Sequence, residues 1–112
     1  MTSFCREFKL YCTQEKMPTL TEINDCYNMC QQVDNLIILE QIKVILEDTL
    51  SNIKAIRAML ILECYLRSRK VEAGVLKSMF CDILTEFQQN CESKDAIMKA
   101  KKILLIISSL NK

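Results

Sequence analysis

The chain has 112 residues, half of them apolar, with one glycine and one proline. This length suits one ordinary domain, and the apolar half is enough for a core without metals or disulfides. Because sheets and long loops need turn residues, the scarcity of glycine and proline disfavours β architectures. We therefore predict one all-α domain over residues 1–112, a compact bundle or array of about five to six helices.

The net charge is only +1, but the charges are unevenly distributed. Residues 1–50 carry four Lys/Arg and eight Asp/Glu, a net charge of −4. Residues 51–112 carry eleven Lys/Arg and six Asp/Glu, a net charge of +5. The basic half can attract an acidic partner. A near-neutral whole chain without tryptophan argues against nucleic acid as that partner.

A first helix is predicted over residues 3–15, where aromatic side chains recur at spacings of four and three and so share one face. Pro18 ends this pattern. Thr19 and Glu22 have the spacing of a capping box, so a second helix begins there and fades near Val33. The residues of the two faces are Phe4, Phe8 and Tyr11 in the first helix and Leu20, Ile23, Tyr27 and Cys30 in the second.

Asp34 and Asn35 are the expected caps of a third helix over about 35–49, which is rich in aliphatic residues and carries Glu40 and Glu47 on its solvent side. A fourth helix over about 52–67 is apolar nearly all round. Because such a helix is usually surrounded by its neighbours, we expect it to be central. Its expected caps are Ser51 or Asn52.

The fifth helix, over about 72–90, has a clean amphipathic stripe. Ser93 or Asp95 is the expected cap of the sixth helix. Positive charge at the end of the fourth helix suits the negative end of a helix dipole. The residues of the sixth helix that we expect to point inward are Ile97, Ala100, Leu104, Ile107 and Leu110.

The sequence offers few residues that are suited to catalysis. Histidine is absent, which removes the commonest general base and the Ser-His and Cys-His nucleophile pairs. Cys26 and Cys30 are the only close cysteine pair, and their spacing on a helix favours packing over zinc binding. Cys91, near Lys94, is the least implausible reactive thiol. We therefore expect no enzyme, no cofactor and no metal.

Cellular location is predicted from the cysteines and from the first residues. Seven cysteines, an odd number spread over apolar helical patterns, suit a reducing compartment. Residues 1–16 mix charged with apolar residues and do not resemble a signal peptide. The longest apolar run, over residues 103–107, is far too short to span a bilayer. We expect an intracellular protein of the nucleus or cytoplasm, without a membrane partner.

Two segments of the second half carry a pattern found in a known family. Tyr65 and Leu66 form an apolar pair in IKAIRAMLILECYLRSRKVEAGV, and Val71 follows at a turn. Ala100 and Lys101 lie in the last predicted helix, KDAIMKAKKILLIISSL. This order resembles the amino-terminal helical domain of transcription elongation factor TFIIS, which elongin A and a Mediator subunit share in variant form.

The resemblance spans residues 53–110, about half the chain. Glu72 stands where the family has its turn glycine, and Ile107 where it has its signature tryptophan. The resemblance implies a scaffold of the transcription machinery that docks short acidic-hydrophobic motifs, with apolar anchors held between the fourth and fifth helices. The residues that would supply partner-binding charge are Arg67, Arg69, Lys70 and Lys77.

The leading hypothesis is an intracellular scaffold or adaptor domain that docks a partner helix or a short acidic-hydrophobic motif. The third, fourth and sixth helices hold more aliphatic residues than a chain of this size easily buries. One alternative is a death-fold or Bcl-2-like regulator of apoptosis or innate signalling, viral or cellular, which a Greek-key bundle would support. Another is an obligate subunit of a homo- or hetero-oligomer, with the apolar face of the second helix as its seam.

Overall fold

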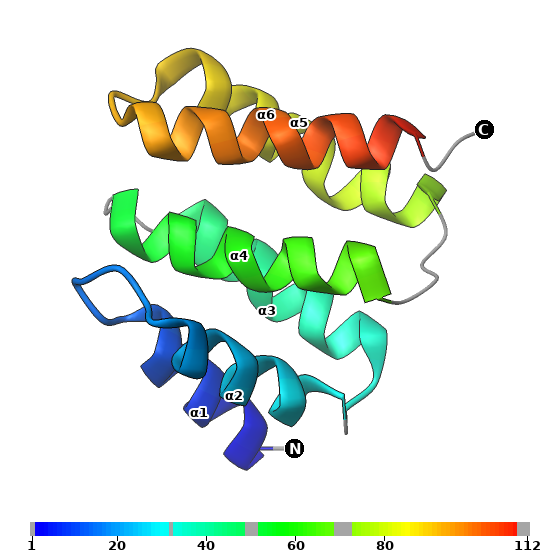
Figure 1. The fold of residues 1–112 in the computed structure, drawn as a ribbon. Helices are drawn as coiled ribbons and strands as arrows, with labels where there is room; N and C mark the ends of the chain where they lie inside the picture. Colours follow the sequence, from blue (N-terminus) through cyan, green and yellow to red (C-terminus); the bar gives the residue numbers. More distant parts are fainter. Residues whose placement is uncertain (1, 32, 49–51, 69–72, 110–112) are drawn as a thin grey trace.

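The computed structural model describes residues 2–31, 33–48, 52–68 and 73–109. These residues form six helices and no strands, which confirms the predicted all-α class (Figure 1). Their radius of gyration of 13.0 Å is that of a compact chain of this length. The helices are α1 (Thr2–Cys12), α2 (Leu20–Cys30), α3 (Asn35–Asp48), α4 (Asn52–Ser68), α5 (Ala73–Asn90) and α6 (Lys94–Ser109).

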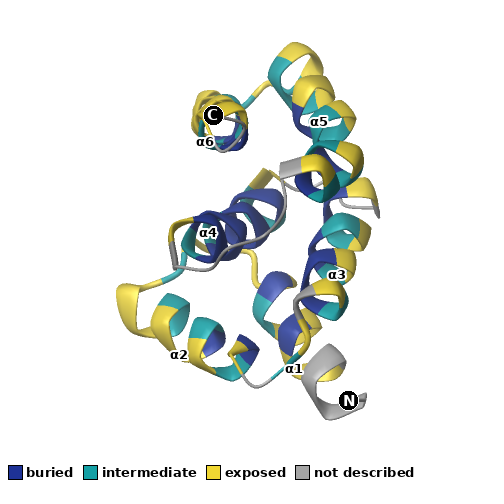
Figure 2. Cartoon of the chain, turned by 90° about the vertical axis from the view of Figure 1, so that its right-hand side faces the viewer, coloured by how far each residue is buried: buried dark blue, intermediate teal, exposed yellow. Residues whose placement is uncertain are grey.

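The helices are stacked as three consecutive pairs, α1 with α2, α3 with α4 and α5 with α6 (Figure 1). Seen from the side, α2, α4 and α6 form one layer and α1, α3 and α5 form the other (Figure 2). Each pair contacts the next, as in the helix-pair stacks of α-solenoids. No described helix is long and apolar enough to cross a membrane.

The core is centred on α4, as the apolar character of its sequence predicts. This helix contacts α1, α2, α3 and α6, and most of its residues are buried. On the α2 side, the rings of Tyr27 and Tyr65 meet edge to face with their centroids 6.1 Å apart. Two charged residues are buried in the same helix, Arg57 and Glu63, and both are accounted for below.

The starts of α2, α3 and α6 follow the predicted caps. Thr19 Oγ1 accepts a hydrogen bond from the Glu22 backbone N at 3.1 Å, and the Thr19 N donates to Glu22 Oε1 at 3.3 Å. The predicted capping box of α2 is therefore confirmed. Asp34 Oδ1 accepts from the Leu36 N at 2.9 Å, and Ser93 Oγ accepts from the Ala96 N at 3.3 Å. Ser51, a predicted cap of α4, lies outside the described residues.

The end of α1 and one face of α2 differ from prediction. Helix α1 ends at Cys12 rather than at residue 15, and Arg57 Nε donates to the Tyr11 carbonyl oxygen, one of those left without a helical partner at this end. Leu20, predicted to be buried, is 74% exposed. The buried side of α2 is centred on Cys26 and Cys30, and Leu20 lies about 100° from that centre around the helix.

The inward face of α6 was predicted correctly at Ala100 and Ile107 and wrongly at Ile97 and Leu104. The structure buries Ala96, Ala100, Ile103 and Ile107. Ile97 and Leu104, which we expected to point inward, are half-buried. Leu110 lies outside the described residues.

Candidate functional site

A group of three cations surrounds a single buried carboxylate where α6 packs on α4. Glu63, on α4, is only 7% exposed. Its Oε1 accepts a hydrogen bond from Lys99 Nζ at 2.8 Å, and its Oε2 accepts from Arg67 Nη2 at 2.9 Å. Lys102 Nζ lies 3.1 Å from the same Oε2. Two of the cations come from α6, so the carboxylate ties α6 to the central helix.

The charges of this group do not cancel. Burial alone would raise the pKa of Glu63, but the hydrogen bonds and charges of Lys99, Lys102 and Arg67 outweigh burial and hold that pKa at about 2. The carboxylate is therefore ionised at neutral pH. Three positive charges and one negative charge leave a net charge of +2. The side chains of Arg67 and Lys102 are 58% and 52% exposed, so the surplus positive charge faces solvent.

The outer face of α6 continues this basic surface. Lys94, Met98, Lys101 and Leu105 follow one another at spacings of four, three and four, so they form one stripe along the helix. All four side chains are exposed, with Met98 at 69% and Leu105 at 64%. We call these four residues the α6 stripe; Lys102 and Asp95 border it. Basic and apolar side chains alternate along this stripe.

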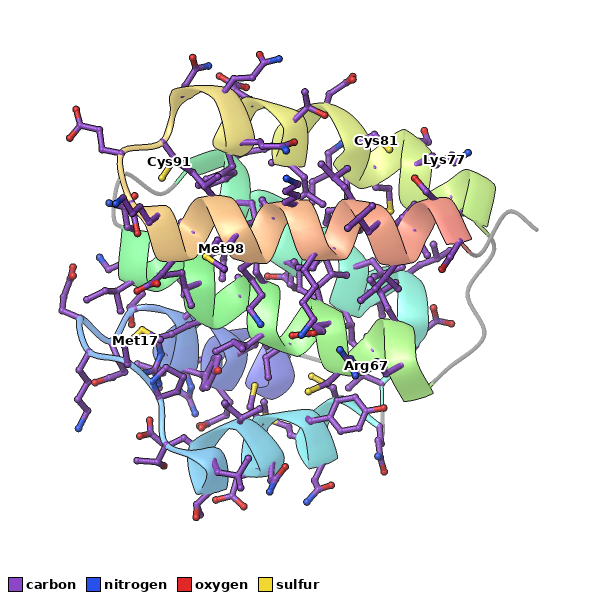
Figure 3. All side chains as sticks on the ribbon, turned by 45° about the horizontal axis from the view of Figure 1, so that its top comes forward. Met17, Arg67, Lys77, Cys81, Cys91 and Met98 are labelled. Carbon is purple, nitrogen blue, oxygen red and sulfur yellow. The ribbon has the colours of Figure 1, made fainter. Side chains whose placement is uncertain are left out.

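The predicted partner-binding residues are not all brought together. Arg67 lies at the end of α4 beside the lysines of α6. Lys77 is half-buried on α5 and lies across α6 from Arg67 (Figure 3). Arg69 and Lys70 lie outside the described residues. Because α6 rather than α5 packs along α4, the surface beside Arg67 is completed by residues of α6.

Lys99 and Lys102 were missing from the predicted site, although a signal for them exists in the sequence. Helix α4 is apolar apart from a few charges, and a charge buried in such a helix needs a partner. Glu63 therefore requires cations from another helix, and α6 carries lysines three residues apart. Which helix packs on α4 depends on the tertiary arrangement, so the pairing itself is not visible in the sequence.

The second buried charge, Arg57, packs against the α1–α2 end of the molecule, and each of its three side-chain nitrogens donates a hydrogen bond. Its side chain is fully buried, and its Nε, Nη1 and Nη2 donate to Tyr11 O at 2.7 Å, Lys16 O at 2.7 Å and Glu22 Oε2 at 2.8 Å. The guanidinium also lies 4.5 Å from the centroid of the Tyr11 ring. Hydrogen bonds from Arg57 and from the backbone of Thr19 lower the pKa of Glu22. These contacts hold the α1–α2 connection on α4, so we assign Arg57 a structural role.

Two open hollows lie away from the basic surface. One, of about 340 Å³, lies between α1 and α2 and includes Glu7, Leu10 and Asp25. The other, of about 510 Å³, is lined by Leu46, Ile83 and Phe87 with Glu47 and Glu86 at its rim, and also by Asn52, Asn90 and Cys91. Both have acidic rims, so neither is suited to an acidic ligand.

The described thiols are in the free form. Burial raises the pKa of Cys12 to about 12, and a hydrogen bond with Cys30 together with burial raises that of Cys26. Cys91, the candidate reactive thiol, is half-buried, and its Sγ donates to Asn52 Oδ1 at 3.1 Å. That contact provides no base. Within the described ranges, no three His, Cys, Asp or Glu side chains are grouped as metal ligands.

No protein family, curated protein or solved structure matches this chain. The resemblance to the TFIIS amino-terminal helical domain therefore stays a prediction that rests on the residues quoted for it.

Proposed function

We propose that this chain is a non-enzymatic intracellular scaffold or adaptor domain that docks a partner helix or a short acidic-hydrophobic motif on the outer surface of α6. The observation that carries the proposal is the α6 stripe, in which two exposed lysines alternate with two large exposed apolar side chains. An amphipathic helix with acidic and apolar residues on one face complements such a stripe. Arg67 and Lys102 add positive charge at its side.

The distribution of exposed apolar residues supports this proposal. The sequence predicts an apolar surplus in the third, fourth and sixth helices. In the described residues α4 exposes no large apolar side chain, whereas α3 and α6 expose two each and α1 and α2 expose one each. The residues are Leu36 and Val44, Met98 and Leu105, Leu10, and Leu20. Exposed apolar side chains grouped with charged ones are typical of interaction surfaces.

The order of the helices favours this hypothesis over the death-fold alternative. A Greek-key bundle would bring distant helices together, whereas here each consecutive pair stacks on the next. The TFIIS resemblance adds transcription as the setting of the proposed function. Of the four residues implied by that resemblance, Arg67 shares the Glu63 carboxylate with Lys99 and Lys102 of α6.

A binding titration with a model peptide tests the proposal. The probe is a fluorescein-labelled helical peptide of about 15 residues, long enough to form a helix, with Leu and Glu alternating along one face. We expect saturable binding that weakens as salt rises, because exposed charges are screened. Lys101→Glu should weaken binding at least about tenfold, since one attraction becomes a repulsion.

Lys9→Glu provides the matched control, because it makes the same exchange at an exposed position on α1. This variant should bind the peptide almost as well as the unsubstituted chain. Equal weakening by both exchanges would show that only net charge matters. That result, or no saturable binding at low salt, would contradict the proposed docking surface.

A further inference from the structure

A second exposed stripe, on α3, has the opposite charge. Leu36, Glu40, Val44 and Glu47 follow one another at spacings of four, four and three and lie on one side of α3. Leu36 is 54% exposed and Val44 is 48% exposed, and both carboxylates are also exposed. Lys43 borders this side and is half-buried. We call Leu36, Glu40, Val44 and Glu47 the α3 stripe; it alternates apolar and acidic residues.

The two stripes match in length and in order. Each runs over twelve residues from first to last, and the eleven steps between them make about 17 Å of helix. If the helices run antiparallel, every lysine of α6 faces a glutamate of α3, and every apolar residue faces another. Of the seven large apolar side chains that the described residues expose, four belong to these stripes, which points to a shared cause. The four facing pairs are Lys94 with Glu47, Met98 with Val44, Lys101 with Glu40 and Leu105 with Leu36.

The two stripes of one molecule cannot meet each other. Helix α6 belongs to one layer and α3 to the other, and the exposed residues of each lie on the outer side of its layer (Figure 2). Each stripe therefore remains available to another molecule. The uneven charge of the chain, acidic in residues 1–50 and basic in residues 51–112, agrees with this separation.

We propose that the partner of the α6 stripe is the α3 stripe of a second copy of this chain, which docks antiparallel and head to tail. This inference rests on the proposed docking function of α6 and names its occupant. The contact joins two different surfaces, so each molecule retains one free α3 stripe and one free α6 stripe. Such heterologous contacts add further copies into a ring or an open filament.

The size of the contact sets its strength. Two helix faces of this length bury less than the roughly 1,200 Å² of a stable standard interface. The association is therefore weak and reversible, and it depends on concentration and on salt. At low salt the average mass should rise above that of the monomer between about 10 µM and 1 mM.

Exchanging the charges of the stripes, alone and together, tests the proposal. One variant carries Glu40→Lys with Glu47→Lys, and the other carries Lys94→Glu with Lys101→Glu. In each variant both stripes have the same sign of charge, so each alone should remain monomeric in light scattering of the reduced protein. An equimolar mixture should associate again, because each stripe of one variant then has an opposite stripe on the other.

A matched control carries Glu7→Lys with Glu92→Lys, two exposed carboxylates outside both stripes. It should associate like the unsubstituted chain. Circular dichroism confirms that each variant is folded. Unsubstituted chain that stays monomeric up to about 1 mM at low salt overturns the proposal. So does a mixture that fails to associate while both variants are folded.

These failures are distinct from a failure of the proposed function. Peptide binding is measured on dilute, monomeric protein and uses only the α6 stripe. Monomeric protein that binds the acidic peptide would overturn self-docking and leave an external partner for α6. Monomeric protein that does not bind the peptide would overturn both.

Discussion

At the scale of single residues, two buried charges in α4 decide how its neighbours are placed. Arg57 donates to the carbonyl oxygens of Tyr11 and Lys16 and to the Glu22 carboxylate, and so holds the α1–α2 end. Glu63 pairs with lysines of α6 and so fixes α6 on α4. An isolated buried charge is costly, and removal of its partners leaves that cost uncompensated. Each buried charge therefore favours one placement of the neighbouring helices over others.

The low pKa of Glu63 predicts a loss of stability in acid. Its pKa is about 2 in the folded protein and 4.5 ordinarily, so the unfolded chain takes up the proton first as the pH falls. Stability from this carboxylate is complete above pH 4.5 and is lost between about pH 4.5 and 2, up to about 3 kcal/mol. Urea unfolding across this range should show a clear decrease.

Glu63→Gln should reduce that decrease, although Glu22, whose pKa is also lowered, contributes in the same direction. Glu86→Gln is the matched control, because it removes an exposed carboxylate from α5. Its pH dependence should follow that of the unsubstituted chain. If Glu63→Gln and Glu86→Gln give the same acid profile, the carboxylate does not contribute as proposed.

At the scale of helices, local signals predict positions well and partners poorly. The start of α2 follows from Pro18 and from the capping box of Thr19 and Glu22, which act within a few residues. The scarcity of glycine favours helices along the whole chain. The exposure of Leu20 depends on which side of α2 meets α4. The cations around Glu63 depend on the packing of α6, which is set by the whole core.

The two faces of α6 should respond differently to the same truncation. Ile107→Ala removes a fully buried side chain and should cost about 2–5 kcal/mol of unfolding free energy. Leu105→Ala, on the α6 stripe, should change stability by less than about 0.5 kcal/mol. Leu105→Ala should weaken binding of the model peptide, because Leu105 is an exposed apolar contact of that stripe.

Urea unfolding and the peptide titration measure the two effects on the same samples. A stability loss of similar size in both variants would mean that Leu105 packs into the core. That outcome would remove one of the two apolar contacts from the proposed docking surface.

At the scale of the whole molecule, stacked helix pairs raise the question of cooperativity. In extended stacks each pair contacts only its neighbours, and an end pair can open separately. Here α4 contacts both helices of the first pair, and Arg57 joins that pair to it through three hydrogen bonds. We therefore expect the described helices to unfold as one unit, as most small domains do.

Three buried thiols of the first pair can report on that unit. Cys12, Cys26 and Cys30 are at most 5% exposed, and their labelling requires the chain to open. Arg57→Met removes the donors to the carbonyl oxygens of Tyr11 and Lys16 and should cost about 3 kcal/mol of unfolding free energy. If opening is global, this loss of free energy raises the open population, so labelling of all three thiols in native buffer should accelerate by the same factor. That factor is on the order of a hundredfold.

Lys9→Met is the control, because it removes an exposed cation from α1 and should alter neither quantity by much. The two measurements, urea unfolding and labelling followed by mass spectrometry, must agree if the fold is cooperative. Faster labelling of the three thiols in Arg57→Met without a matching loss of unfolding free energy would show that α1 and α2 open alone. The chain would then behave as a stable α3–α6 unit carrying a detachable first pair, and Arg57 would be the residue that closes it.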